Sequence, residues 1–109
     1  MNIVRLDDGA ATRLTLRGEL DMETGDLVEE QVARVLAGRP AELVVDLEGL
    51  TFCDSSGIDV LLAARETAVR AGVAFRVTRP SGIVLRSLTI TGVLPLLTGS
   101  DRETAGGRP

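Results

Sequence analysis

The 109-residue sequence contains no histidine, lysine, tryptophan or tyrosine, so all of its basic residues are arginines. Without histidine, a serine or cysteine nucleophile has no imidazole base, and no cysteine–histidine metal site can form. Without lysine, neither a serine–lysine dyad nor the lysine of a phosphate-binding loop is available. These absences exclude the commonest catalytic arrangements. We therefore expect a protein that is not an enzyme and that holds no cofactor or metal.

Aromatic residues and excess positive charge are also scarce. Phe52 and Phe75 are the only aromatic residues, and the net charge is −4. Nucleic-acid binding is disfavoured because the chain has neither a basic stripe nor a stacking platform. The apolar runs fall far short of the roughly 20 residues of a membrane span, and Met1 to Arg5 lacks the layout of a signal peptide. We expect a cytoplasmic protein with a protein or small-ligand partner.

The single cysteine, Cys53, cannot form a disulfide within the chain, which suits a reducing compartment. Two interpretations of this residue remain open. It could be a redox-sensitive thiol, because it directly precedes a serine-containing turn. The favoured interpretation is an inert core residue, since free cysteine is commonly buried.

Patterns typical of strands and helices alternate along the sequence, and 44% of the residues are hydrophobic, enough for one core. Asp7-Asp8-Gly9 predicts a hairpin turn. The expected strands are Asn2–Asp7, Ala11–Arg17, Leu43–Leu47, Val73–Thr78 and Val93–Leu97, the last an edge strand because of Pro95. The expected helices are Met22–Ala37, the segment between Ser56 and Gly72, and Ser81–Thr91. The core faces of the first two helices are expected to contain Leu27, Val28, Val32, Val35, Leu36, Ile58, Leu61, Leu62, Ala68 and Val69.

This order of elements predicts an α/β fold. The opening antiparallel pair and the strand–helix alternation from Ala11 onward indicate a mixed, mostly parallel sheet of about five strands with helices packed against it. We expect one domain over residues 1–97. Residues 98–109 form a polar tail that we expect to be frayed.

A turn between a predicted strand and a predicted helix reads Cys53-Asp54-Ser55-Ser56-Gly57. It lacks the first glycine of the hydrolase motif G-x-S-x-G. In one interpretation Ser55 or Ser56 is simply the N-cap of the helix, and with Ser56 as cap Asp59 takes the third position of a capping box. In the other, a phosphate on Ser56 adds roughly −1.5 to −2 charges beside the helix N-terminus and changes the surface without unfolding the helix.

Acidic side chains could also gather near this turn. Asp21, Asp46 and Asp54 could all lie in loops on one side of the sheet. A hydrolase based on paired carboxylates needs a cleft and perturbed pKa values in addition. We therefore favour solvated or capping roles for these residues.

Three motifs at suitable spacing resemble one known family. They are Gly18-Glu19-Leu20-Asp21, then Val44-Val45-Asp46-Leu47 leading to Phe52-Cys53-Asp54-Ser55-Ser56-Gly57, and Leu85-Arg86 leading to Thr91-Gly92-Val93-Leu94. Together they resemble a STAS domain of the bacterial anti-sigma factor antagonist type. The resemblance covers about Ile3 to Leu97.

The resemblance implies a partner-switching regulator of transcription. The unphosphorylated protein would bind an anti-sigma factor that is also a serine kinase, and phosphorylation would release it; a serine phosphatase would restore binding. The acceptor maps to Ser56, with Asp21 and Asp54 as its acidic neighbours. Ser55 maps to a neighbour, and Gly57 completes the motif. The alternative is a STAS-type structural or regulatory subunit of a transport ATPase or a larger signalling assembly, without a phosphorylation switch.

One position departs from the family pattern. Asp59 stands where many relatives have glycine. Its carboxylate near the start of the helix would repel a phosphate on Ser56.

Overall fold

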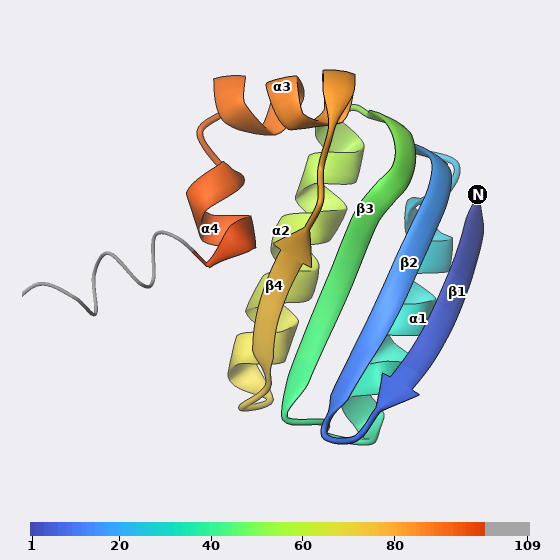
Figure 1. Cartoon of the computed structure of the whole chain (residues 1–109), viewed down its shortest axis with the longest axis vertical. Helices are drawn as coiled ribbons and strands as arrows, with labels where there is room; N and C mark the ends of the chain where they lie inside the picture. Colours follow the sequence, from blue (N-terminus) through green and yellow to red (C-terminus); the bar gives the residue numbers. More distant parts are fainter. Residues whose placement is uncertain (100–109) are drawn as a thin grey trace, which may run out of the picture.

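The structure is a computed structural model that describes residues 1–99 (Figure 1). A four-stranded sheet has the order β1-β2-β3-β4. Its strands are β1 (Asn2–Asp8), β2 (Ala11–Leu20), β3 (Glu42–Cys53) and β4 (Ala74–Thr78). The helices are α1 (Gly25–Ala37), α2 (Ser55–Arg70), α3 (Gly82–Ile90) and α4 (Leu94–Thr98). The α/β class and the mixed sheet are thus confirmed.

The sheet combines one antiparallel pair with two parallel pairs. Strands β1 and β2 are antiparallel, whereas β2–β3 and β3–β4 are parallel. The predicted hairpin is confirmed, and Gly9 takes the left-handed conformation (φ 62°) that its turn needs. Strand β3 lies between β2 and β4, as its continuous apolar run predicted, but it extends beyond the expected range, to Cys53.

Helices α1 and α2 cover one face of the sheet, while α3 crosses its upper end and α4 lies beside β4 (Figure 1). The buried side chains form one core between the sheet and these helices. The largest fully buried members are Leu14, Leu16, Leu20, Leu43, Leu47, Leu61, Leu88, Leu97, Val28, Val35, Val45 and Val77. Within residues 1–99, no helix covers the opposite face of the sheet (Figure 1).

The predicted fifth strand was wrong. Val93–Leu97 contributes instead to the short helix α4, and the sheet has four strands. Pro95 falls in the first turn of this helix, where its missing N–H leaves no hydrogen bond unmade. Leu97 is fully buried, and Gly99 ends the helix in the left-handed conformation (φ 86°). Thr98 therefore belongs to α4, and the rest of the predicted frayed tail, residues 100–109, lies outside the described residues.

The predicted start of the first helix was also wrong. The backbone amides of Thr24 and Gly25 donate to the carbonyl of Asp21, so a turn precedes α1, which begins at Gly25 instead of Met22. Leu27 and Val69 were expected in the core but are exposed, at 48% and 56%. Val28, Val32 and the remaining predicted core positions of α1 are buried.

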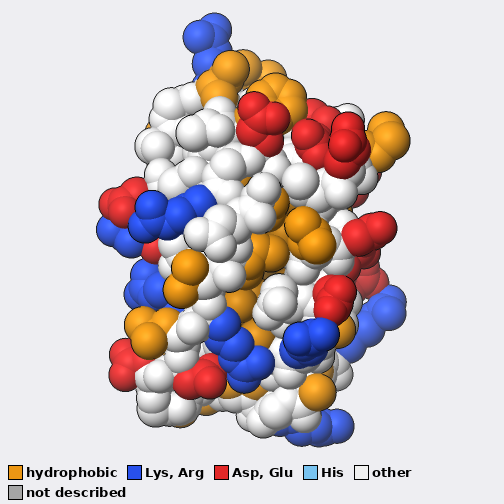
Figure 2. Space-filling view, turned by 90° about the vertical axis from the view of Figure 1, so that its right-hand side faces the viewer, with side chains coloured by type: hydrophobic (Ala, Val, Ile, Leu, Met, Phe, Trp, Pro, Cys, Tyr) orange, Lys and Arg blue, Asp and Glu red, His pale blue; other side chains and the backbone are white. Residues whose placement is uncertain are grey.

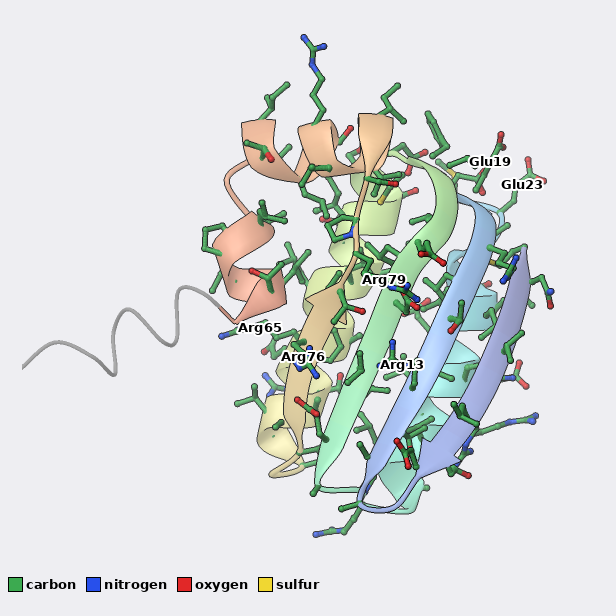
Figure 3. All side chains as sticks on the ribbon, viewed as in Figure 1. Arg13, Glu19, Glu23, Arg65, Arg76 and Arg79 are labelled. Carbon is green, nitrogen blue, oxygen red and sulfur yellow. The ribbon has the colours of Figure 1, made fainter. Side chains whose placement is uncertain are left out.

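A buried carboxylate lies on the open face of the sheet. Asp46 is only 1% exposed, because Arg13 of β2 and Arg79, which directly follows β4, lie over it. Two nitrogens of Arg79 donate to its carboxylate at 2.5 and 3.2 Å, the Glu48 N–H donates at 3.1 Å, and Arg13 lies 3.5 Å away. Figure 3 shows Arg13 and Arg79 in front of the sheet on this face. The network links β2 and β3 to the segment that leads into α3.

Burial of Asp46 alone would raise the pKa of its carboxyl group. The hydrogen bonds from Arg79 and from the Glu48 N–H, with the charges of Arg79 and Arg13, outweigh that effect and lower the pKa. Asp46 is therefore held as a paired anion inside the fold.

Candidate functional site

The serine turn lies where β3 meets α2, at the carboxyl end of the parallel strands. Asp54 is the N-cap of α2: its backbone is extended, and its Oδ1 accepts the Gly57 N–H at 3.0 Å. The prediction that Ser55 or Ser56 caps the helix was wrong. Asp54 takes the N-cap position instead of either serine. It is the last residue with extended backbone before the helix, and its carboxylate accepts the Gly57 N–H.

The two serines of the turn differ in their surroundings. Ser56 is half-buried, and its Oγ donates to Asp54 Oδ1 at 2.6 Å. Ser55 is exposed. The structure thus brings Ser56 and Asp54 together, as the resemblance implied.

The Ser56–Asp54 hydrogen bond also shows what this site cannot do. The hydrogen bond from Ser56 and the Gly57 N–H lower the pKa of the Asp54 carboxyl group. A carboxylate with a lowered pKa is a poor acceptor of a proton from a serine hydroxyl. Within residues 1–99 no histidine or lysine could take that proton instead. The geometry presents Ser56 as a hydroxyl that could be modified and not as an activated nucleophile.

Gly57 is the point of closest packing in the turn. A Cβ at this position would lie 2.6 Å from the carbonyl oxygen of Leu20 and 2.9 Å from Cys53 Sγ. The Asp54 N–H also donates to the Leu20 carbonyl, at 3.3 Å. Gly57 therefore lets the start of α2 contact the end of β2. This packing places the Asp21 turn beside the serine turn.

Asp21 orders its own turn. Its Oδ1 accepts the N–H groups of Glu23 at 3.0 Å and Thr24 at 3.1 Å, and Thr24 Oγ1 donates to the carbonyl of Glu19. Among the described residues, no hydrogen bond joins Asp21 to Ser56. Asp21 thus lies at the same end of the sheet as the acceptor, in the adjoining turn, and does not contact its hydroxyl.

Exposed apolar and acidic side chains surround the two turns. Met22 is 83% exposed, and Phe52 is also exposed where β3 pairs with Glu19 of β2. Figure 3 shows Glu19 and Glu23 projecting at this end of the molecule. Neither Met22 nor Phe52 was predicted to be a surface feature; the available signal for Met22 was its place as an apolar residue in a polar segment.

Asp59 is exposed on α2, one turn from the N-cap. It therefore adds a carboxylate to the acidic end of the molecule, as expected, and makes no hydrogen bond with the serines in residues 1–99.

Two further sequence hypotheses concerned Cys53 and Asp46. Cys53 is buried, and burial followed by the Asp54 charge raises the pKa of its thiol to about 11. The thiol therefore stays protonated at neutral pH, which supports the inert interpretation. Asp46 points to the open face of the sheet with Arg79, so the hypothetical cluster of Asp21, Asp46 and Asp54 does not form.

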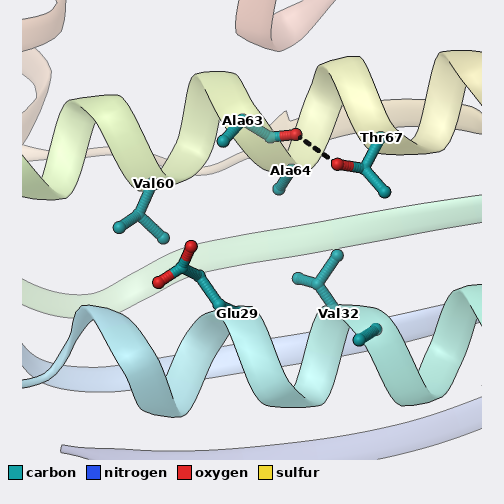
Figure 4. Close-up of a pocket in the computed structure, with 7 residues that line it drawn as sticks. Glu29, Val32, Val60, Ala63, Ala64 and Thr67 are labelled. Carbon is teal, nitrogen blue, oxygen red and sulfur yellow. Dashed lines mark hydrogen bonds between the residues drawn. The ribbon is translucent and has the colours of Figure 1, made fainter.

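A hollow lies between α1 and α2 (Figure 4). It is lined by Glu29, Val32, Ala33, Val60, Ala63, Ala64 and Thr67. The Thr67 hydroxyl already donates to the Ala63 carbonyl at 2.9 Å. Glu29 is then the one titratable group in its lining, so the hollow lacks the paired groups that acid–base chemistry requires.

Residues 1–99 contain no group of three or more aspartate, glutamate or cysteine side chains placed to hold a metal ion. None of the helices in that range is long and apolar enough to cross a membrane.

Comparison with known proteins identifies relatives of this architecture. The STAS domain family matches residues 3–105. The anti-sigma-F factor antagonist RsfB of Mycobacterium tuberculosis is 30% identical over 87 residues, which cover 80% of this chain and 70% of that protein.

Solved structures show the same fold. An anti-sigma factor antagonist from Mycobacterium paratuberculosis has 27% identity and a TM-score of 0.80, covering 95% of this chain and 92% of that one. SpoIIAA in its unphosphorylated form has 19% identity and a TM-score of 0.74, covering 86% and 84%. The phosphorylated form of the Bacillus cell fate determinant SpoIIAA has 23% identity and a TM-score of 0.62, covering 86% of each chain. The chain belongs to the STAS domain family, and its relatives include anti-sigma factor antagonists.

Proposed function

We propose that this protein is an anti-sigma factor antagonist controlled by phosphorylation of Ser56. In its unphosphorylated form it binds an anti-sigma factor that is also a serine kinase, and that kinase phosphorylates Ser56 and so releases it. The observation that carries the proposal is the Ser56 hydroxyl, held at 2.6 Å from Asp54 at the start of α2. The names of the relatives, one of which has a phosphorylated form, support the same role.

A phosphate on Ser56 changes the turn in two ways. The modified oxygen has no proton to donate, so the hydrogen bond to Asp54 is lost and two anions face each other. The exposed N–H groups and the dipole at the helix N-terminus favour an anion, so α2 itself persists. The consequence is a local rearrangement of the turn with the core intact.

The surface around the turn explains why the partner would leave. Met22 and Phe52 offer apolar contact area beside the serine turn. A partner packed on these side chains removes water from the turn, and burying an unpaired phosphate there carries a large desolvation penalty. Asp59 adds repulsion from within the protein. The unmodified serine, which is neutral and hydrogen-bonded, carries no such penalty.

The proposal assigns no catalysis to this chain. The kinase supplies the phosphoryl transfer, and a serine phosphatase hydrolyses the phosphoserine and restores the binding form. We place this exchange in the cytoplasm, where the sigma factor acts.

The acceptor can be tested with a candidate anti-sigma factor kinase from the same organism. The protein is incubated with the kinase and ATP, and phosphorylated peptides are mapped by mass spectrometry. We expect one phosphate on Ser56, no labelling of Ser56→Ala, and full labelling of the matched control Ser55→Ala. Labelling of Ser55 instead, or none on either serine, would contradict the proposal.

Binding distinguishes the switch from a permanent docking role. We expect Ser56→Asp to bind the anti-sigma factor far more weakly than Ser56→Ala does. Equal binding by both variants would favour the STAS-type structural subunit of a transport ATPase or signalling assembly.

A further inference from the structure

Strand β1 presents an unpaired edge to solvent. It is the outermost strand of the sheet, pairs with β2 over seven residues without a bulge, and contains no proline (Figure 1). Proteins commonly blunt such edges with bulges, proline or charged side chains, because free N–H and C=O groups recruit another strand. The charged residues of β1, Arg5, Asp7 and Asp8, are of both signs, so they can pair with those of a second copy. The opposite edge strand, β4, is shorter and has α4 beside it.

Apolar side chains flank this edge on both faces of the sheet. Leu6 is 57% exposed and Val4 is also exposed, both on the open face. On the helix face, Met1, Ile3 and Leu27 line a hollow with Glu30 and Gln31. Figure 2, which views the molecule from the β1 side, shows hydrophobic side chains gathered in the middle of this surface with charged groups around them.

We propose that two copies of this chain pair through antiparallel β1 strands and form one continuous eight-stranded sheet. A two-fold axis perpendicular to the sheet keeps the helices of both copies on one side. Directly opposed residues of an antiparallel pair project to the same face, so the axis must lie midway between one residue of β1 and the same residue of the second copy. Each register is named below by the residue at its axis. Few registers are therefore possible.

Charge selects among these registers. An axis through Arg5 places the two arginines opposite each other, and an axis through Asp7 does the same to two carboxylates. An axis through Val4 sets Arg5 opposite an isoleucine. An axis through Leu6 pairs Leu6 with its own copy and sets each Arg5 opposite Asp7 of the second copy. Each Val4 then lies opposite Asp8, at the ends of the paired segment, so this register is favoured by its two Arg5–Asp7 pairs.

The Leu6-centred register suits the existing hydrogen bonds. The Nε of Arg5 donates to Asp7 of the same strand at 3.1 Å. The terminal nitrogens of the guanidinium carry further donors that can reach Asp7 of the second copy. Because β1 lies at the side of the sheet and Ser56 at its carboxyl end, pairing leaves the serine turn accessible (Figure 1).

Sedimentation equilibrium of the whole chain over a range of concentrations tests the proposal. We expect the mass to rise from one chain toward two. Leu6→Lys should remain a monomer with an unchanged circular dichroism spectrum, because Leu6 is exposed in the single chain. Ile83→Lys, at a similarly exposed site (59%) on α3, should dimerise normally. A wild type that stays monomeric, or a Leu6→Lys variant that still dimerises, would overturn the proposal.

Charge reversal tests the register. Arg5→Asp or Asp7→Arg alone should weaken dimerisation about 10-fold or more, since each sets like charges opposite each other. The double variant should restore dimerisation, because the opposite charges then face each other again. Failure of the double variant to recover would overturn the Leu6-centred register.

Discussion

Strand β3 contains one aspartate, Asp46, and leads to another, Asp54, just beyond its end, and the two are held in different ways. Asp46 is buried and paired with two arginines. Asp54 is half-buried and held by neutral donors, the Ser56 hydroxyl and the Gly57 N–H. In both cases the hydrogen bonds lower the pKa of the carboxyl group.

The difference separates a fixed element from a changeable one. Removing Asp46 would break its ion pair with Arg13 and would leave Arg79 paired only with Glu48. Adding a phosphate to Ser56 would break one hydrogen bond at the surface and leave the core untouched. The middle of β3 therefore maintains the fold, whereas the turn at its end can change state while the fold persists.

The largest effect is expected at the fixed carboxylate. Asp46→Ala removes two hydrogen bonds from Arg79 and one from the Glu48 N–H. We expect a loss of about 2 to 4 kcal/mol in the free energy of unfolding. The loss is smaller than for a wholly buried ion pair, because the arginines regain hydration at the surface. Urea denaturation of the variant and the wild type measures this difference in the free energy of unfolding. Glu66→Ala, which breaks the exposed pair with Arg70, serves as the control and should cost under about 0.5 kcal/mol.

A somewhat smaller effect is expected where the serine turn joins the fold. Gly57→Ala places a Cβ against the Leu20 carbonyl and Cys53, so β2 and α2 must separate slightly. We expect a loss of about 2 kcal/mol, within the range for overpacked sites. Gly38→Ala is the matched control, since its Cβ would meet only ordinary contacts at 3.5 Å. Equal stability of the two variants would show that the turn is looser than its packing indicates.

The smallest effect concerns the pKa of Asp54. Because the Ser56 hydrogen bond is the main cause of its lowered pKa, Ser56→Ala should raise that pKa toward the ordinary value, and Ser55→Ala should leave it unchanged. The stabilisation of the fold by the Ser56–Asp54 hydrogen bond is therefore present at neutral pH. It is lost as the pH falls through the lowered pKa of Asp54 in the folded state. A carboxyl NMR titration of the three proteins measures the shift. An identical Asp54 pKa in all three would disprove the role of the hydroxyl.

Much of this architecture could be predicted from the sequence. The hairpin, the central strand and the helices produced periodic or alternating apolar patterns, and the Asp-Ser-Ser-Gly turn fell between a strand and a helix as expected. Val93–Leu97 could not be assigned correctly, because a five-residue apolar segment fits a strand or a short helix equally well. Pro95 is compatible with both, and tertiary packing of Leu97 decided for the helix.

The details of the site depended on contacts that sequence patterns do not encode. Asp54, Ser55 and Ser56 are all good N-cap residues, and only the backbone conformation shows that Asp54 takes the position. Asp46 is separate from the acidic end of the molecule because β3 continues beyond it to Cys53, whereas the predicted strand ended at Leu47. The exposure of Met22 was missed because the predicted helix began at that residue, whereas a turn precedes α1.

The most direct test of the central claim is the affinity of the anti-sigma factor for the protein with serine or phosphoserine at position 56, measured by isothermal titration calorimetry. We predict that phosphoserine weakens binding by roughly 100-fold or more, as expected for an unpaired charge at a buried contact. Circular dichroism should show the same fold for both forms. Equal affinity of the two forms would contradict the assignment of Ser56 as the switch.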